Sequence, residues 1–568
     1  MSVQFYDLYT EFGEHLEQPI WQEYPRPQMR RNSFLNLNGP WEFTAKKGKQ
    51  FPRQYNSTIL VPFCPESLLS GIHQHFGEDQ YLFYRRNVTL PEGFLKGRLL
   101  LHFGAVDQQV EVFVNGRIVG RHTGGYNAFC LDITDDCTPE MTLTLRIKDD
   151  LRDKTLPYGK QSLKRGGMWY TPVSGVWQTV WMESVPTGYI QDMHLDVTLE
   201  EATVTLTPPL NGTAFFEGRQ LPVVEGKVTL RPAEPECWTP ENPKLYSFEL
   251  HCGEDTVSSY FALRTLETKL VDGVPRLCLN GKPYFFHGVL DQGYWPDGLY
   301  TPATEKAFEL DILEMKKLGF NTLRKHIKVE PEAFYYACDR LGMIVFQDMV
   351  NNSRYSFLLD TVLPTIGLQR KNDSRSHKDP ASRKAFYACM DATVQQLKNH
   401  PSVCYWTIFN EGWGQFCADE AYKRLKKQDS SRFIDTASGW FRGAKSDVES
   451  LHIYFGSFNK LQPSDKPLVL SECGGYCYGV EAHLFCPEKS YGYRNCKDKD
   501  RFRSDLEGLY RDKILPAAQR GLCACILTQI CDVEEEINGL LTYDRKVCKA
   551  DGENMLHLAG ELKKTVEE

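Results

Sequence analysis

Glu411 and Glu472 each follow a short apolar run that predicts a buried strand, residues 402–410 for the first and 467–471 for the second. Glycine comes within two residues of each carboxylate, which indicates that the strands stop there. The carboxyl ends of buried parallel strands meet at the mouth of an α/β structure, where chemistry is placed. Two carboxylates facing one cavity suit glycoside cleavage, since one protonates the leaving oxygen and the other attacks or stabilises the sugar cation.

A solvated position at a strand end is the alternative for either glutamate taken alone. Both carboxylates are flanked by Asn, Gly, Trp or Ser, residues that suit a sugar pocket, and this favours the catalytic interpretation. No nucleophile elbow, phosphate-cradling glycine loop or His-Glu-x-x-His motif offers another chemistry.

Further polar and aromatic side chains fall at or near the ends of predicted strands, and we expect them to line the same cavity. They can contact a sugar hydroxyl, orient a carboxylate or stack on a sugar ring, and each has a structural role as its alternative. The expected substrate-binding residues are Asn410, Arg324, His326, Asp348, His452, Tyr454, Trp413, Trp440, His287 and Asp291. Trp406 lies inside its apolar run and is more typical of a core residue.

The 568 residues are too many for one hydrophobic core and predict about three or four domains. A net charge of -8 implies neither nucleic acid nor a membrane surface as a partner. We expect no cofactor and no metal, because no cysteine or histidine set has zinc-ligand spacing. The eighteen cysteines, with no export signal before them, favour a cytoplasmic protein with reduced thiols, and homo-oligomer formation stays open.

Three segments with different patterns follow one another along the chain. Short alternating runs predict a β-sandwich in residues 1–186, including a hairpin at Asn115-Gly116, whose residues suit a type I′ turn. Thinner, proline-punctuated strands in residues 187–268 predict a small immunoglobulin-like sandwich. Strands then alternate with helices in residues 269–568. This last pattern predicts a (β/α)8 barrel.

Eight buried runs in the last segment supply the strands of that barrel. They cover residues 284–289, 321–327, 343–348, 402–409, 433–437, 450–454, 467–471 and 524–529. The loops after the third and seventh runs, residues 349–384 and 476–503, are much longer than ordinary βα loops. We expect both loops to shape a substrate entrance.

The chain resembles glycoside hydrolase family 2, which includes β-galactosidases, β-glucuronidases and β-mannosidases. The motifs that carry the resemblance are at residues 37–43, 84–86, 167–178, 292–295, 410–414 and 471–472. The resemblance implies that Glu411 is the general acid/base and Glu472 the nucleophile of a retaining exo-β-glycosidase. It also implies that Asn410 contacts the 2-hydroxyl of the sugar.

Two departures from the family pattern bear on the substrate. Where β-glucuronidases of the family carry Asn-x-Lys, this chain has Glu536-Ile537-Asn538, whose carboxylate would repel a uronate. Where relatives often have tryptophan, the eighth run ends in Thr528-Gln529. A β-galactoside is therefore our first expectation, with β-glucuronide, β-mannoside, β-glucoside or α-L-arabinopyranoside as alternatives. A carbohydrate-binding protein without catalysis is the interpretation from another class.

Overall fold

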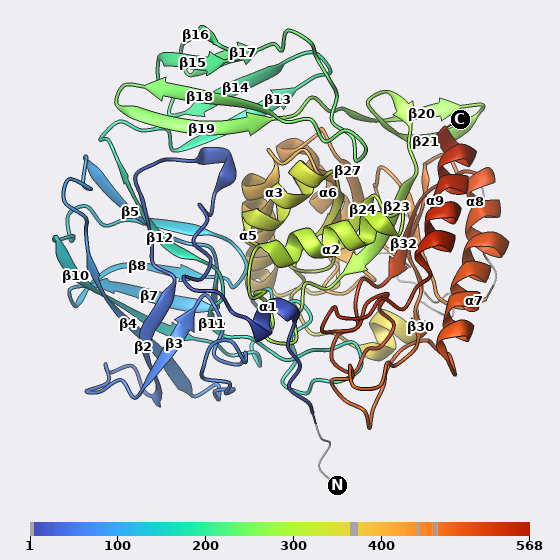
Figure 1. Cartoon of the computed structure of the whole chain (residues 1–568), viewed down its shortest axis with the longest axis horizontal. Helices are drawn as coiled ribbons and strands as arrows, with labels where there is room; N and C mark the ends of the chain where they lie inside the picture. Colours follow the sequence, from blue (N-terminus) through green and yellow to red (C-terminus); the bar gives the residue numbers. More distant parts are fainter. Residues whose placement is uncertain are drawn as a thin grey trace.

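The computed structural model describes residues 5–363, 368, 373–439, 444–456, 458, 461 and 464–567. The chain forms a β-sandwich, a second and smaller β-sandwich, and a barrel of parallel strands surrounded by helices (Figure 1). The first sandwich lies beside the barrel, and the second lies across the top of both in the view of Figure 1. The presence of two β-sandwiches and a carboxyl-terminal (β/α)8 barrel confirms the expected fold class.

The first sandwich packs a four-stranded sheet against a six-stranded sheet, and both are antiparallel. Alternate residues of the facing strands, such as Trp41, Phe43 and Leu101, form its buried core. The smaller sheet has the order β1 (Phe34–Asn36), β12 (Val180–Val185), β5 (Arg98–Phe103), β9 (Phe129–Asp132). The larger has the order β3 (Ser57–Val61), β2 (Gly39–Lys47), β4 (Gln80–Thr89), β10 (Glu140–Lys148), β7 (Gln109–Val114), β8 (Arg117–Thr123).

The predicted hairpin joins β7 to β8. Its two turn residues, Asn115 and Gly116, have φ angles of +50° and +80°, as a type I′ turn requires. The hairpin prediction is confirmed.

A short pair, β6 (Val106–Asp107) with β11 (Gly175–Val176), lies beside the two main sheets.

The second sandwich has sheets of three and four strands around a small apolar core. Their orders are β13 (Asp192–Val197), β14 (Ala202–Thr207), β17 (Lys227–Leu230), and β16 (Arg219–Val223), β15 (Gly212–Phe216), β18 (Tyr246–Cys252), β19 (Asp255–Phe261). A three-stranded sheet, β20 (Leu266–Val271), β21 (Val274–Leu279) and β22 (Lys282–Pro283), then leads into the barrel. The domain limits at residues 186 and 268 stay predictions.

The barrel sheet contains eight parallel strands, one for each predicted run. The strands are β23 (Phe286–Asp291), β24 (Thr322–Lys325), β25 (Ile344–Asp348), β26 (Val403–Asn410), β27 (Phe433–Ser438), β28 (Glu449–Ile453), β29 (Leu468–Gly474) and β32 (Leu522–Thr528). Hydrogen bonds link them in sequence order around the ring, apart from β27 and β28. Side chains join these two strands instead, since Ser450 donates to Asp435 at 2.9 Å.

Helices cover the outside of the barrel (Figure 1). Gly342 ends the helix before β25 with a left-handed φ of +74°, a conformation that glycine adopts readily at a helix C-terminus. The helices of this layer are α2 (Lys306–Lys317), α3 (Glu332–Leu341), α5 (Pro380–Leu397), α6 (Ala418–Gln428), α7 (Lys499–Leu509), α8 (Leu515–Gln519) and α9 (Gly552–Glu567).

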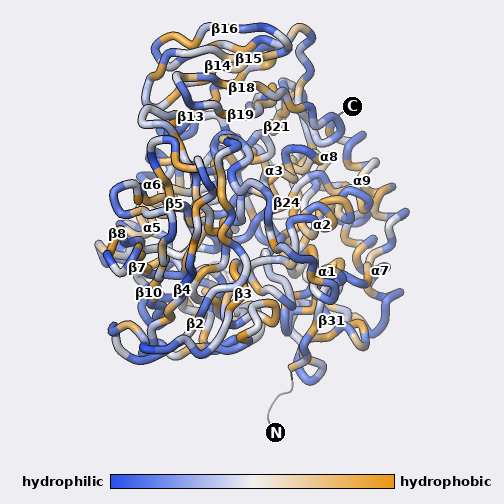
Figure 2. The backbone as a smooth tube through the Cα atoms, turned by 60° about the vertical axis from the view of Figure 1, so that its left-hand side comes forward, coloured by the Kyte–Doolittle hydropathy of each residue, from blue (hydrophilic) through white to orange (hydrophobic). Residues whose placement is uncertain are grey.

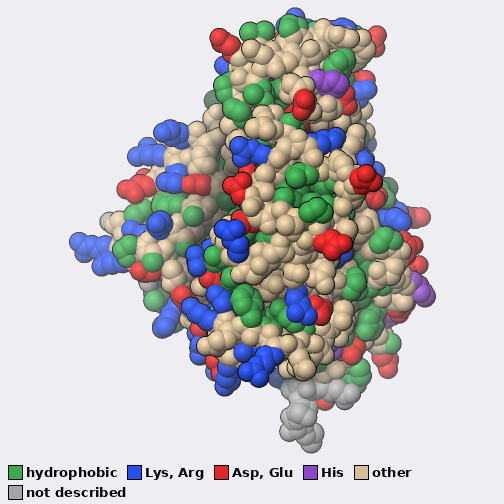
Figure 3. Space-filling view, turned by 90° about the vertical axis from the view of Figure 1, so that its left-hand side faces the viewer, with side chains coloured by type: hydrophobic (Ala, Val, Ile, Leu, Met, Phe, Trp, Pro, Cys, Tyr) green, Lys and Arg blue, Asp and Glu red, His purple; other side chains and the backbone are tan. Residues whose placement is uncertain are grey.

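The amino-terminal segment packs on the barrel as well. Thr10, which caps the short helix α1 (Glu11–Glu14), donates from its hydroxyl to the buried Asp297 at 2.6 Å. Apolar stretches run through the interior of the molecule and polar stretches along many outer loops (Figure 2). Basic and acidic side chains are interspersed on the face of the first sandwich (Figure 3). None of the helices in the described part of the chain combines the length and hydropathy that a membrane span requires.

Candidate active site

Glu411 directly follows β26 and leaves the strand through a left-handed turn. Its φ is +53°, Gly412 follows with a φ of +73°, and the Glu411 amide donates to the Ser438 carbonyl at 2.9 Å. This turn holds the side chain over the carboxyl end of the barrel, where it keeps 14% of its surface exposed. A carboxyl that solvent can reach is suited to exchanging protons with substrate and water.

Glu472 lies inside β29, two residues before the strand ends at Gly474. The register of β29 against β32 shifts between Leu470 and Cys473, the interval that contains Glu472. The predicted strand end is therefore a local irregularity within the strand. The Glu472 side chain is only 6% exposed, because the ends of neighbouring strands surround it.

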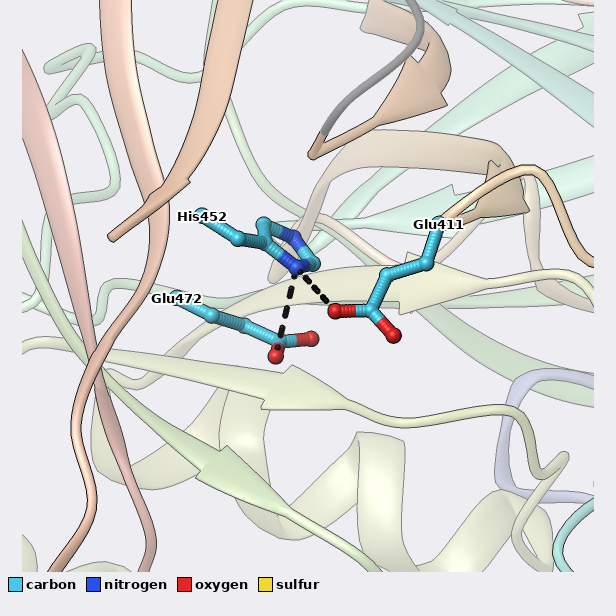
Figure 4. Close-up of side chains that lie close together, drawn as sticks. All are labelled: Glu411, His452 and Glu472. Atoms are coloured by element: carbon cyan, nitrogen blue, oxygen red, sulfur yellow. Dashed lines mark hydrogen bonds and ion pairs between the residues drawn. The ribbon is translucent and has the colours of Figure 1, made fainter. Parts of the chain in front are cut away.

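His452, near the end of β28, lies between the two carboxylates (Figure 4). Its Nδ1 is 2.8 Å from Oε1 of Glu411 and 3.4 Å from Oε2 of Glu472. One oxygen of each carboxylate and the histidine nitrogen all lie within 4.8 Å of one another. Retaining glycosidases place their two carboxyl groups about 5–5.5 Å apart, whereas inverting enzymes need about 6.5–9.5 Å. The separation in this protein matches the shorter class.

Arg324, at the end of β24, holds the floor of the site together. Its guanidinium is 3.0 Å from both Asp348 and Glu472, donates to the Ser471 carbonyl at 2.9 Å, and donates to Oδ1 of Asn410 at 2.9 Å. The side chain is 1% exposed. Five planar donors in a fixed geometry let one arginine orient groups from several strands at once.

Two more predicted residues complete this network. His326 places Nδ1 2.8 Å from Oδ2 of Asp348, so the aspartate joins it to Arg324. Tyr454 donates to Oε2 of Glu472 at 2.5 Å, and its ring stacks on Tyr493 with centroids 3.9 Å apart. The structure thus brings Asn410, Arg324, His326, Asp348, His452 and Tyr454 together around the glutamate pair.

The Glu472 carboxyl is buried, and burial alone would raise its pKa. The charges of His452 and Arg324 and the hydrogen bond from Tyr454 act in the opposite direction, and the pKa lies below its ordinary value. Glu472 is therefore ionised at neutral pH. Burial together with the Glu472 charge raises the pKa of Tyr454 well above its usual range, so Tyr454 keeps the proton that it donates.

The cluster of Glu411, His452 and Glu472 also has the spacing of metal ligands. A metal ion would meet the guanidinium of Arg324, which already lies 3.0 Å from Glu472. A buried cation beside the carboxylate opposes a second cation at the same place. The donor set therefore does not fit a divalent metal.

Two predicted residues, His287 and Asp291, lie away from the glutamate pair. His287 faces the outer helical layer, where its ring nitrogens lie 2.9 Å from the Gly319 carbonyl and 2.7 Å from the Tyr510 hydroxyl. Asp291 pairs with Lys325 at 2.6 Å, and that lysine lies over the ring of Phe334 outside the barrel. Both residues lie on β23, four positions apart. The period of two along a strand therefore turns both side chains to the same side, away from the barrel axis.

The structure describes one of the two predicted tryptophans. Trp413 is 2% exposed and packs against Tyr158, Trp169 and Tyr355, so it supports the wall of the site without offering an open face. Trp440 lies outside the described residues.

The first sandwich contributes to this site, which the sequence pattern did not predict. Its segment 154–171 docks on the barrel mouth, where the Tyr158 amide donates to the Asn351 carbonyl at 3.1 Å and Tyr170 donates to Glu536. Trp169 lies edge-on to Trp413, with Lys160 5.7 Å from its ring. Part of this segment carries a family motif, but periodicity along one strand does not reveal which other domain it meets.

Two β-sandwiches precede an eight-stranded barrel, which carries paired carboxylates at its carboxyl end. This arrangement defines a class of multidomain barrel protein with a glycosidase-like site. Two parts of the chain match models of glycoside hydrolase family 2. Residues 73–140 match the model of the "Glycosyl hydrolases family 2, sugar binding domain", and residues 271–470 match the model of the "Glycosyl hydrolases family 2, TIM barrel domain".

Curated relatives carry two different names. A β-glucuronidase of Felis catus is 25% identical over 445 residues, which is 68% of this chain. A β-galactosidase of Thermoanaerobacter pseudethanolicus is 26% identical over 521 residues, which is 81% of this chain. The aligned part spans 65% of the length of each of these two relatives.

Solved structures share the fold over nearly the whole chain. A family 2 β-galacturonidase of Eisenbergiella tayi superposes with a TM-score of 0.67 at 19% identity, covering 95% of this chain and 98% of the other. A β-D-glucuronidase of Dictyoglomus thermophilum gives a TM-score of 0.71 at 16% identity, with coverage of 95% and 98%. Identities this low establish the fold alone.

Proposed function

We propose that the protein is a retaining exo-β-glycosidase that hydrolyses terminal, non-reducing sugars. The observation that carries this proposal is the carboxylate pair, whose nearest oxygens lie within 4.8 Å across the barrel mouth. That spacing leaves no room for a water molecule between sugar and carboxylate, so it favours direct attack by one carboxylate.

Glu472 acts as the nucleophile in the first step. Its ionised oxygen attacks the anomeric carbon, and the bond from that carbon to the leaving oxygen breaks as Glu411 transfers its proton to that oxygen. Arg324 and Tyr454 hold Glu472 in place and keep it charged. The products of this step are the free alcohol and a glycosyl ester on Glu472.

The second step returns the enzyme to its starting state. Glu411, now a carboxylate, takes a proton from water, and the water oxygen attacks the anomeric carbon as the ester bond to Glu472 breaks. His452 lies within hydrogen-bond distance of Glu411, at 2.8 Å, and orients that carboxylate in both steps. Retention of the β configuration follows from two successive inversions.

Asn410 is suited to hold the sugar beside the reacting carbon. Its Oδ1 accepts from Arg324 at 2.9 Å, which leaves the amide nitrogen as the group that can donate to a sugar hydroxyl. The resemblance to the family assigns this contact to the 2-hydroxyl. Hydrogen bonds at that position strengthen as the transition state forms.

A β-galactoside is the glycone that we propose first. Glu536 is buried beside the site, where burial raises its pKa and the charge of Glu472 raises it further. It accepts from Tyr170 and, at 2.9 Å, from Asn538, which is the behaviour of a carboxylate. A uronate would bring a second carboxylate next to Glu536. That carboxylate would be buried without a direct partner for its charge, which is unfavourable.

A β-glucuronide or related uronide is the second candidate, and Lys160 favours it. This lysine is close enough to His326 and Glu536 to affect the pKa of each, and no carboxylate among the described residues pairs with it. A cation at the pocket wall can bind a sugar carboxylate. The relatives include enzymes named β-glucuronidase and β-galacturonidase.

A panel of 4-nitrophenyl glycosides tests the proposal. We expect release of nitrophenol from the β-galactoside at least about tenfold faster, in kcat/KM, than from the β-glucuronide or β-galacturonide. Faster turnover of a uronide would select the second candidate. No turnover of any β-glycoside would favour a carbohydrate-binding protein without catalysis.

A further inference from the structure

A second cavity lies at the junction between the small sandwich and the barrel. Its volume is about 370 Å³, and its walls come from residues 194–203 and 261–266 of the sandwich side and from residues 398–401 and 427–432 of the barrel. A volume of this size is large enough for a small organic ligand. The barrel residues precede β26 and β27, so the cavity lies at the amino-terminal end of the barrel.

This position separates the cavity from the glutamate pair. Glu411 follows the carboxyl end of β26, whereas the cavity lies before its first residue, Val403. The eight residues of the strand span about 25 Å at the usual rise of a β-strand. The cavity therefore shares no residue with the site of the proposed reaction.

Arg264 is the unusual residue of this cavity. It is 4% exposed, and its buried Nε has no hydrogen-bond partner. Its guanidinium forms no hydrogen bond or ion pair with any described residue. Burial lowers the pKa of Arg264, yet arginine remains charged in proteins. A buried N–H without an acceptor is costly, and a ligand in the cavity that accepts from Arg264 would remove that cost.

The other charges around the cavity do not neutralise Arg264. Each acidic residue of the lining already has a basic partner: Asp429 pairs with Arg432 at 3.0 Å, Asp196 with His194 at 3.0 Å, and Glu201 with Arg231. Two lining lysines, Lys398 and Lys427, form no ion pair with any described carboxylate. Lys398 donates to Gln395 at 2.9 Å, and Arg264 and Lys427 have no ion-pair partner among the described residues. The lining thus holds three cations without a direct ion pair.

We propose that this cavity binds a small oxyanion, either inorganic phosphate or the phosphate or carboxylate group of a small organic molecule. The planar guanidinium of Arg264 offers paired N–H donors that match the oxygens of phosphate or carboxylate. Lys398 and Lys427 add charge from the barrel side. The bound anion joins the small sandwich to the barrel, so binding stabilises the folded arrangement of the two.

Isothermal titration calorimetry and thermal unfolding of the whole protein test this site, with inorganic phosphate as the first probe. We expect one phosphate per chain to bind and Tm to rise by about 2 °C or more relative to sodium chloride at equal ionic strength. Glucose 6-phosphate and citrate, used in the same way, distinguish a free phosphate from a phosphorylated or carboxylated ligand.

Arg264→Met is the decisive variant. Because Arg264 has no hydrogen-bond or ion-pair partner among the described residues, we expect Arg264→Met to fold with an unchanged or higher Tm without phosphate, and to bind phosphate at least about tenfold more weakly. Lys427→Gln, which removes an exposed lysine of the lining, should weaken binding less, and Lys227→Gln, on an exposed position outside the lining, should leave it unchanged. Unchanged phosphate affinity in Arg264→Met, or no response of the wild-type protein to any of the three anions, would overturn the proposal.

Discussion

Tyr454 donates its hydroxyl to Oε2 of Glu472 at 2.5 Å, while Arg324 contacts the other oxygen of the same carboxylate at 3.0 Å. Glu411, by contrast, is partly exposed and has His452 as its neighbour at 2.8 Å. Two carboxylates a few ångströms apart thus have different surroundings. This difference is what a double displacement needs, since one group must stay ionised while the other carries a proton.

Tyr454→Phe should move the acidic limb of the pH profile. The pKa of Glu472 is held below its ordinary value in part by the Tyr454 hydrogen bond, so its loss raises that pKa. We expect the acidic limb of kcat/KM, which reports the free enzyme, to shift to higher pH, with kcat about tenfold lower. Unchanged pH dependence would show that the hydrogen bond does not tune Glu472.

The rise in the pKa of Glu472 that we expect in Tyr454→Phe also changes how the stability of the protein depends on pH. A carboxyl with a depressed folded-state pKa contributes stability that is present above its unfolded pKa and is lost as the pH falls through the folded value. Tyr454→Phe reduces that contribution, so the difference in unfolding free energy between variant and wild type should be larger at pH 7 than below the folded pKa. Denaturant titrations at both pH values measure it.

Glu472→Gln should lower kcat by about 10³-fold or more while the fold stays intact, because an amide cannot form the glycosyl ester. The amide is close in size to the carboxyl and can still accept a hydrogen bond from Arg324. The measurement is turnover of an activated aryl glycoside, with Tm and circular dichroism as folding controls. A rate near that of the wild type would remove Glu472 from the role of nucleophile.

Glu411→Ala should affect substrates according to their leaving groups. Acid assistance contributes about 10²–10⁴-fold for a poor leaving group and much less when the alcohol leaves easily. We expect a large loss of kcat/KM with an alkyl glycoside and a small one with a dinitrophenyl glycoside. Equal losses with both substrates would assign Glu411 another role.

Glu536→Gln and Lys160→Met distinguish the two candidate glycones. If Glu536 repels uronates, Glu536→Gln should raise the ratio of β-glucuronide to β-galactoside turnover by about tenfold, because the buried negative charge is gone.

If Lys160 binds a sugar carboxylate instead, Lys160→Met should abolish uronide turnover and leave galactoside turnover within about twofold. Lys164→Met, on the same segment, serves as the matched control. A variant pair that leaves the ratio unchanged would show that neither residue selects the glycone.

The barrel and its polar floor were predictable from the chain because their signals are local. All eight strand runs were found from apolar runs between helices, and polar residues at their ends led to Arg324, Asp348 and His452. His287 and Asp291 were misplaced because a single buried strand does not reveal which alternate side chains face the axis.

The remaining walls depend on contacts between domains. Lys160, Trp169 and Tyr170 belong to the first sandwich. Tyr170 makes a ring contact with the barrel residue Tyr294, and Trp169 makes one with Tyr355, both more than 120 residues further along the chain. Their position depends on how two separately formed cores dock, which no periodicity encodes. The cavity at Arg264 arises in the same way, between the second sandwich and the barrel.

The stereochemistry of hydrolysis tests the central claim most directly. Proton NMR of the first turnovers, before the free sugar interconverts between its anomers, shows which anomer the enzyme releases. A carboxylate pair with oxygens within 4.8 Å and a buried nucleophile at Glu472 predicts release of the β anomer from a β-glycoside. Release of the α anomer would contradict the double displacement and the assignment of Glu472.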